Sequence, residues 1–218
     1  MIRRSMALPG FLIDQLSHPR GAFAPVTAAL LNGFNARTIL AGISALDLRA
    51  GQRVVEVGFG GGLSLPLLLR AVGGKGQVFA VETSEEMLAR VRRRFIVQRL
   101  QGRLRLERAT IEALPLGDES FDAALSINTI PFWTDVDEGM RELARVLAPG
   151  GRLVLGIASP QEMMTSGMAT QGHRVVVPER LGARLDRYGF ELLEQRASAD
   201  GTALLVAERI DEGWGDEL

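Results

Sequence analysis

The feature that most restricts the fold of this chain is a glycine-rich segment at residues 53–67, RVVEVGFGGGLSLPL. A short valine-rich run ends in a cluster of glycines, and an apolar helical pattern begins at Leu63. Valine-rich runs bounded by glycine are typical of buried parallel strands. A glycine turn between such a strand and a helix lets the main chain approach a ligand closely, and the free N–H groups that open the helix favour an anionic or carboxylate-bearing group.

The rest of the chain alternates between predicted strands and helices, which indicates a parallel sheet with helices on both faces. Strands are expected at residues 53–57, 77–81, 103–107, 121–127 and 152–158, with two closing strands at 190–196 and 202–209. Helices are expected at residues 63–72, 84–99, 135–147 and 178–188.

Upstream of the glycine segment we expect two more helices, at residues 26–33 and 35–46, with Asn35 as the N-cap of the second. The predicted organisation is therefore a helical cover over residues 1–50, one globular domain over residues 51–210 and a loose tail at residues 211–218. The segment at residues 159–177 is expected to be an insert before the last helix.

Composition excludes several other classes of protein. The 218 residues carry a formal net charge of −1 and no cysteine, which excludes disulfides and thiolate metal sites and fits a reducing cytoplasm. No apolar run approaches the roughly 18 residues of a membrane span, and Asp14 interrupts the short apolar stretch near the start, so a signal peptide is not expected. Two separated histidines and scattered carboxylates lack the spacing of metal ligands.

The glycine segment resembles a known family motif. Its spacing, Glu56-x-Gly58-x-Gly60-x-Gly62, resembles motif I of the class I S-adenosylmethionine-dependent methyltransferases. The dinucleotide fingerprint would instead need glycine at the position of Leu63. The resemblance implies that the glycines face the methionine and ribose portions of S-adenosylmethionine and that Glu56 orients its ammonium end.

The next segment, VETSEEML at residues 81–88, resembles motif II of the same family. The resemblance implies that Glu82 accepts hydrogen bonds from the ribose hydroxyls, as acidic residues do in nucleotide-binding folds. It also puts Thr83 at the cofactor and Met87 near the adenine. Alternatively, Glu82 is only an acid favoured by the helix dipole. Thr83, with Glu86 three residues later, has the spacing of a capping box.

Two further segments resemble family motifs. ATIEALPL at residues 109–116 resembles the segment that borders the adenine, with Thr110 in place of the usual Asp and Ile111 beside it. FDAALSIN at residues 121–128 resembles motif IV and its strand. Asn128 would follow the carboxyl end of that strand, where it contacts either S-adenosylmethionine or the methyl acceptor, or serves only as a turn residue.

The segment RELARVLAPGGRLV at residues 141–154 resembles the helix-to-strand junction of the family and supports the fold alone. Together the motifs cover about residues 48–157. They imply a Rossmann-like seven-stranded α/β sheet, mostly parallel with an antiparallel last strand, and methyl transfer from S-adenosylmethionine to a small, partly apolar molecule. The alternatives are a non-catalytic S-adenosylmethionine-binding or partner-binding module and, less favoured, an NAD(P)-dependent oxidoreductase.

Candidate catalytic residues are few. A general base is needed only if the acceptor ionises poorly, and the candidates are His18, Asp135 and His173. An arginine cluster within residues 90–108 could face RNA, but only Phe95 is interleaved with it, so we expect a solvated face and no nucleic-acid partner. A homodimer is compatible with the sequence, which leaves the acceptor and the methylated atom open.

Overall fold

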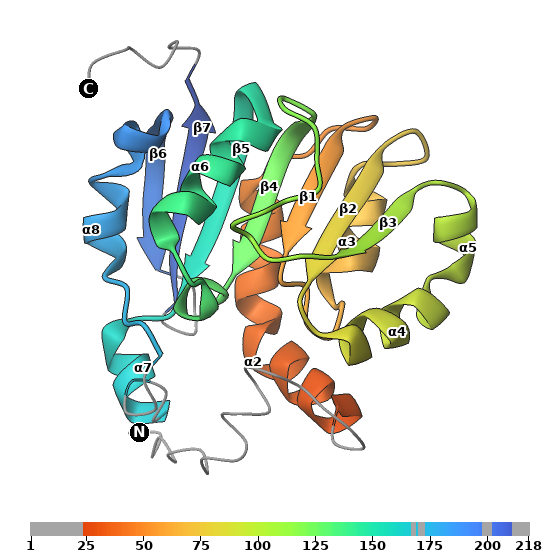
Figure 1. The fold of residues 1–218 in the computed structure, drawn as a ribbon, viewed down its shortest axis with the longest axis horizontal. Coiled ribbons are helices and arrows are strands. Elements are labelled where there is room, and N and C mark those ends of the chain that lie inside the picture. The colour runs from red at the N-terminus through yellow and green to blue at the C-terminus, as the bar shows by residue number, and fades with distance from the viewer. Residues whose placement is uncertain (1–23, 167–168, 170–172, 198–201, 211–218) are drawn as a thin grey trace.

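The computed structural model describes residues 24–166, 169, 173–197 and 202–210. Its centre is a seven-stranded sheet in the order β3-β2-β1-β4-β5-β7-β6 (Figure 1). Strands β1 to β5 pair in parallel, and β7 runs antiparallel to both of its neighbours. The predicted sheet with its antiparallel last strand is therefore confirmed. The strands are β1 (Arg53–Val57), β2 (Gln77–Glu82), β3 (Leu104–Arg108), β4 (Phe121–Ile127), β5 (Leu147–Ile157), β6 (Phe190–Ala197) and β7 (Ala203–Arg209).

Helices cover both faces of this sheet (Figure 1). They are α2 (Ala24–Ala45), α3 (Ser64–Ala71), α4 (Glu85–Arg94), α5 (Ile96–Leu100), α6 (Val136–Val146), α7 (Pro160–Ser166) and α8 (Pro178–Gly182), with 3-10 turns η2 (Ile130–Phe132) and η4 (Leu185–Tyr188). None of the helices within the described ranges is long and apolar enough to cross a membrane.

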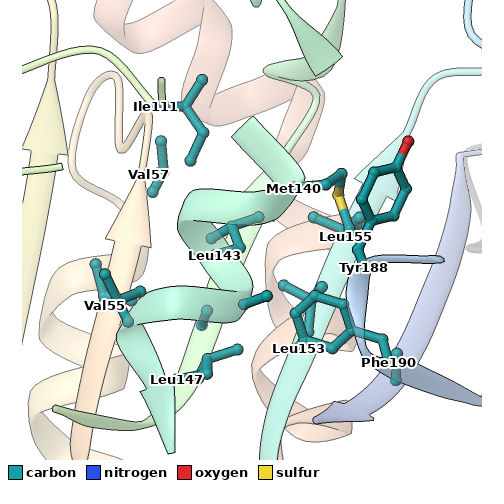
Figure 2. Packing of buried hydrophobic residues seen from close by; sticks show 14 of the residues in the cluster. Val55, Val57, Ile111, Met140, Leu143, Leu147, Leu153, Leu155, Tyr188 and Phe190 are labelled. Carbon is teal, nitrogen blue, oxygen red and sulfur yellow. The ribbon is translucent and has the colours of Figure 1, made fainter. Parts of the chain in front are cut away.

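The side chains of the central strand β1 alternate between two apolar cores. Val54 belongs to the core that contains residues of α2, α3 and α4. Val55 and Val57 belong to the core on the opposite face, with residues of α6 and η4 (Figure 2). Because successive side chains of a strand point to opposite faces, this alternation fixes β1 in the sheet and brings Glu56 to the α3 side.

The structure corrects several expected boundaries. The two upstream helices form one helix, α2, so Asn35 lies inside a helix and is not an N-cap. The helix expected at residues 84–99 divides at Phe95, whose backbone leaves helical geometry while its side chain is buried. The N-cap of α4 is Ser84, whose hydroxyl accepts from the Met87 N–H, and not Thr83. Strand β5 begins at Leu147, before the Pro-Gly-Gly turn, because Leu147 already pairs with Phe121.

A glycine at the start of β2 supplies a test of this packing. A Cβ on Gly76 would lie 2.5 Å from the Val72 carbonyl oxygen and 2.7 Å from that of Gln52, whereas one on Gly74 would meet nothing within 4 Å. Gly76→Ala should therefore lower the free energy of unfolding by about 3 kcal/mol, because main chain cannot move aside easily. Gly74→Ala is the matched control and should change it by less than about 0.5 kcal/mol in denaturant titrations. Equal stability of the two variants would contradict the close approach of Gly76 to the Val72 and Gln52 carbonyls.

Candidate functional site

A cavity of about 770 Å³ opens where the carboxyl ends of β1, β2 and β4 meet. Parallel strands place the loops that follow them at one edge of the sheet, and ligands of open α/β sheets bind there. Most of its lining comes from the residues that follow β1, β2, β3 and β4, namely 56–61, 81–87, 108–112, 127–129 and 131–134. Asn35 and Ile39 of α2, together with His173, complete the described lining.

The glycine loop lines this cavity with main chain. Gly58 and Gly60 both adopt positive φ, at 76° and 51°, a region that side chains rarely allow. The Gly58 N–H donates to the Val81 carbonyl at 2.8 Å, and a Cβ on Gly58 would collide with the Thr129 side chain. Glycine is therefore required at this turn by both conformation and space.

Glu82 joins the glycine loop to the next turn. Its Oε2 accepts from the Gly60 N–H at 2.9 Å. Its Oε1 accepts from the N–H groups of Thr83 at 2.8 Å and Ser84 at 3.1 Å. A carboxylate has about four lone-pair sites, so Oε2 can accept one more donor from a ligand. The carboxylate thus reaches both turns and still faces the cavity.

Glu56 lies beneath the loop and is only 3% exposed. The Ser64 hydroxyl, in the first turn of α3, donates to its Oε2 at 2.7 Å. Burial, reinforced by the nearby charge of Glu82 and opposed by the Ser64 hydrogen bond, raises the pKa of Glu56 to about 7. A buried carboxyl with such a pKa would bind a cationic group that pairs with its charged form.

An amide pair lines another part of the cavity. Asn128 follows β4 in the left-handed region, with φ at 56°, and its Nδ2 donates to Asn35 Oδ1 at 2.9 Å. Within the described part of the chain, the buried Asn128 Oδ1 has no hydrogen-bond partner. Because buried polar atoms are usually paired, this oxygen is an unsatisfied acceptor at the edge of the cavity. Sequence reasoning missed Asn35, since 93 positions separate the two residues.

Aromatic side chains form the adjoining wall. The Trp133 Nε1–H donates to the Thr129 hydroxyl at 3.0 Å, and Thr129 also contacts the Ser126 hydroxyl. Phe132 and His173 pack edge to face, with ring centroids 5.0 Å apart. This wall combines flat apolar surface with few polar atoms, which suits a partly apolar ligand.

The structure gathers most of the predicted site residues in this one cavity. The predicted cofactor-binding residues in the lining are Glu56, Gly58, Gly60, Glu82, Thr83, Met87, Thr110, Ile111 and Asn128. Gly62 is not among the described lining residues. A Cβ at this position would lie 3.0 Å from the Val91 side chain, so the glycine allows the loop to pack closely against α4.

The three candidate bases have different positions. His173 lines the cavity. Asp135 is the N-cap of α6, where its side chain accepts from the Glu138 N–H at 3.1 Å. His18 lies outside the described residues. The described residues contain no group of three His, Cys, Asp or Glu side chains that could hold a metal ion.

The charges of the lining favour a cationic or neutral ligand. Arg108 is the single arginine among the described lining residues, and its Nε–H donates to the Thr83 carbonyl at 3.2 Å. The carboxylates are those of Glu56, Glu82, Glu85, Glu86 and Glu112. A site with this excess of carboxylates attracts positive charge.

Comparison with known proteins points to one family. Residues 55–155 match the family model described as a methyltransferase domain. Over 110 residues, or 50% of this chain and 39% of the relative, the sequence is 37% identical to methyltransferase GfsG of Streptomyces halstedii. Over 125 residues, or 57% of this chain and 49% of the relative, it is 35% identical to the ubiquinone/menaquinone biosynthesis C-methyltransferase UbiE of Pseudomonas putida. The chain thus spans half or less of the length of these relatives.

The fold is similar to that of a SAM-dependent methyltransferase from Aquifex aeolicus, with a TM-score of 0.69. The two sequences are 19% identical, and the match covers 93% of this chain and all of the other. At this identity the likeness concerns the fold alone.

The buried carboxyl of Glu56 supplies a test that needs no ligand. A folded-state pKa near 7, above the ordinary 4.5, means that the folded protein holds a proton which the unfolded chain has released. The resulting stabilisation is complete below about pH 4.5 and is lost as the pH rises through 7, by up to about 3 kcal/mol. Glu56→Gln keeps a polar group for Ser64 but cannot ionise.

The free energy of unfolding of Glu56→Gln minus that of the wild type should therefore increase as the pH rises from 5 to 8. Urea titrations at each pH measure this difference. Exposed Glu191→Gln on β6 is the control, and its difference from wild type should stay flat over this range. A flat difference for Glu56→Gln as well would contradict the raised pKa.

Proposed function

We propose that this chain carries a class I S-adenosylmethionine-dependent methyltransferase domain and transfers the methyl group of that cofactor to a small, partly apolar acceptor. The observation that carries the proposal is the joint placement of Gly60 and Glu82 in one cavity, 2.9 Å apart through a hydrogen bond. Separate surfaces for these residues would have left the motifs without a common ligand.

The residues of the cavity fit S-adenosylmethionine. Its ammonium group would be held near Glu56, whose buried carboxyl needs a cation in its charged form, and the methionine portion would lie along Gly58 and Gly60. Glu82 would accept from a ribose hydroxyl with the remaining lone pair of Oε2. Thr110 and Ile111 would border the adenine. When bound, the cofactor supplies a methyl group already activated by the sulfonium charge.

The rest of the cavity is assigned to the methyl acceptor. Asn128, Phe132 and Trp133 line this part of the cavity, and the two aromatic side chains offer apolar surface. The excess of carboxylates disfavours a phosphorylated acceptor, because like charges repel. A partly apolar acceptor also agrees with the quinone biosynthesis named for the relative UbiE.

The main task of the protein is then placement. Holding the acceptor atom in line with an activated methyl group, in a cavity that excludes water, supplies most of the acceleration. Where an acceptor must lose a proton, His173 is the proposed base, since it lines the cavity while Asp135 caps a helix.

The first test concerns Glu82. Glu82→Ala removes a carboxylate that would form charge-assisted bonds to the ribose and that also holds the Gly60 N–H. The dissociation constant for S-adenosylmethionine should rise at least about tenfold in calorimetry. Glu191→Ala, on the exposed far edge of the sheet, should bind as the wild type does. Unchanged affinity of Glu82→Ala would remove this carboxylate from the cofactor site.

The second test uses pH. If the charged form of Glu56 pairs with the cofactor ammonium, binding must expel the proton held by a group with a pKa of about 7. The dissociation constant should fall roughly fivefold to tenfold between pH 6 and pH 7.5. The Glu56→Gln variant should bind more weakly and show little change over this range. A parallel pH response in both proteins would place the proton on another group.

Two further experiments on the same protein samples distinguish methyl transfer from the alternative functions. A rise in melting temperature with S-adenosylmethionine but not with NADH supports the proposed cofactor, because a ligand stabilises the state that binds it. Binding of the cofactor without methyl transfer across a broad panel of phenols, quinols and amines would favour a non-catalytic binding module.

A further inference from the structure

The apolar side chains of helix α5 are exposed to solvent. None of its five residues is buried, and Ile96, Val97 and Leu100 are 54%, 55% and 84% exposed. Short helices obtain most of their stability from packing of an apolar face. In Figure 1 this helix is the outermost element beyond the edge strand β3, on the far side of the sheet from β6. An apolar projection of this kind marks an interaction surface.

The helix is held in this exposed position by well-packed neighbours. The residue before it, Phe95, is 5% exposed and belongs to the same core as Val91 and Leu104. After the helix, the Arg103 guanidinium donates to the carbonyl oxygens of Leu69 at 2.7 Å and Gly73 at 2.6 Å. The outward direction of the three apolar side chains is therefore a product of the fold.

The surroundings of the helix are strongly basic, although the whole chain is nearly neutral. Between residues 85 and 108 there are eight arginines and three glutamates. Glu85 and Glu107 are paired with Arg92 and Arg105. In the described structure, no ion pair neutralises Arg93 or Arg99, and Arg94 lies over the Phe95 ring. We define the basic–apolar patch as Arg93, Arg94, Ile96, Val97, Arg99 and Leu100.

We propose that the basic–apolar patch docks this protein onto an anionic lipid bilayer. Aliphatic side chains that project among cations enter the boundary between headgroups and acyl chains, while the guanidinium groups bind lipid phosphates. The binding is peripheral and involves no membrane span. It is independent of the cavity and of the proposed methyl transfer.

Other occupants of the patch fit less well. A second copy of this chain docked on the same patch would bring two groups of arginines together, with like charges opposed. Nucleic acid would find no exposed aromatic side chain for base stacking within this patch, since Phe95 is buried. A five-residue helix offers little of the roughly 800 Å² per partner that a stable protein interface requires, whereas a bilayer needs no matching shape.

Flotation with lipid vesicles tests the proposal on the full 218-residue chain. The wild type should float with equimolar phosphatidylcholine and phosphatidylglycerol and stay at the bottom with phosphatidylcholine alone. Raised salt should weaken the binding, because it screens the arginines. Leu100→Ser and the double variant Arg93→Glu/Arg99→Glu should each reduce the affinity for the anionic vesicles at least about tenfold.

Matched controls come from the opposite edge of the sheet. Leu193→Ser on β6 removes another exposed leucine, and Arg180→Glu/Arg187→Glu reverses two exposed arginines of α8 and η4. These variants should bind vesicles as the wild type does, and melting temperatures should show that all variants fold. Failure of the wild type to float, equal binding to neutral vesicles, or equal losses in the controls would each overturn the proposal. Binding that Arg93→Glu/Arg99→Glu abolishes but Leu100→Ser leaves intact would overturn the docking of the apolar side chains in favour of charge attraction alone.

Discussion

The carboxylate of Glu82 holds together the two turns on which the cavity depends. One oxygen accepts from the glycine loop after β1, and the other from the turn that begins α4. These bonds are available because β1 and β2 run in parallel register, with Val57 opposite Val81, so both turns leave the sheet at the same level. A shift of one residue in this pairing would turn the carboxylate to the other face. The strand register is therefore the condition for a single site.

The same alternation explains the unusual chemistry of Glu56. Its neighbours Val55 and Val57 pack into the core around α6, which forces the intervening side chain beneath α3. In that position the Ser64 hydroxyl donates to the carboxyl, and burial outweighs this hydrogen bond in setting the pKa. The protein thus keeps a carboxyl that is close to half-ionised at neutral pH next to a loop whose main chain is open to the cavity. A cation bound nearby would stabilise the charged form of Glu56.

Much of the fold and part of the site could be predicted from local sequence. Strand β4 was placed at its observed bounds, and the residues of the glycine loop and Glu82 follow directly from strand ends, where periodicity and turn chemistry are strongest. Features set by distant packing could not be predicted in this way. Asn35 reaches the cavity only because α2 crosses the end of β4, and Gly62 faces Val91 because α4 packs against the loop. The exposure of Ile96, Val97 and Leu100 could not be predicted either, since an apolar helical pattern predicts burial.

The position of β7 has a consequence for how the sheet is completed during synthesis. This strand follows β6 in the sequence, yet it lies between β5 and β6 in the sheet. Strands β1 to β5 can pair while the chain still emerges from the ribosome, but β6 pairs only with β7 in the described sheet. A nascent chain that ends before Ala203 therefore exposes the free edge of β5 together with an unattached β6, a combination that invites aggregation or chaperone binding. Closure of this side of the sheet waits until β7 has been synthesised.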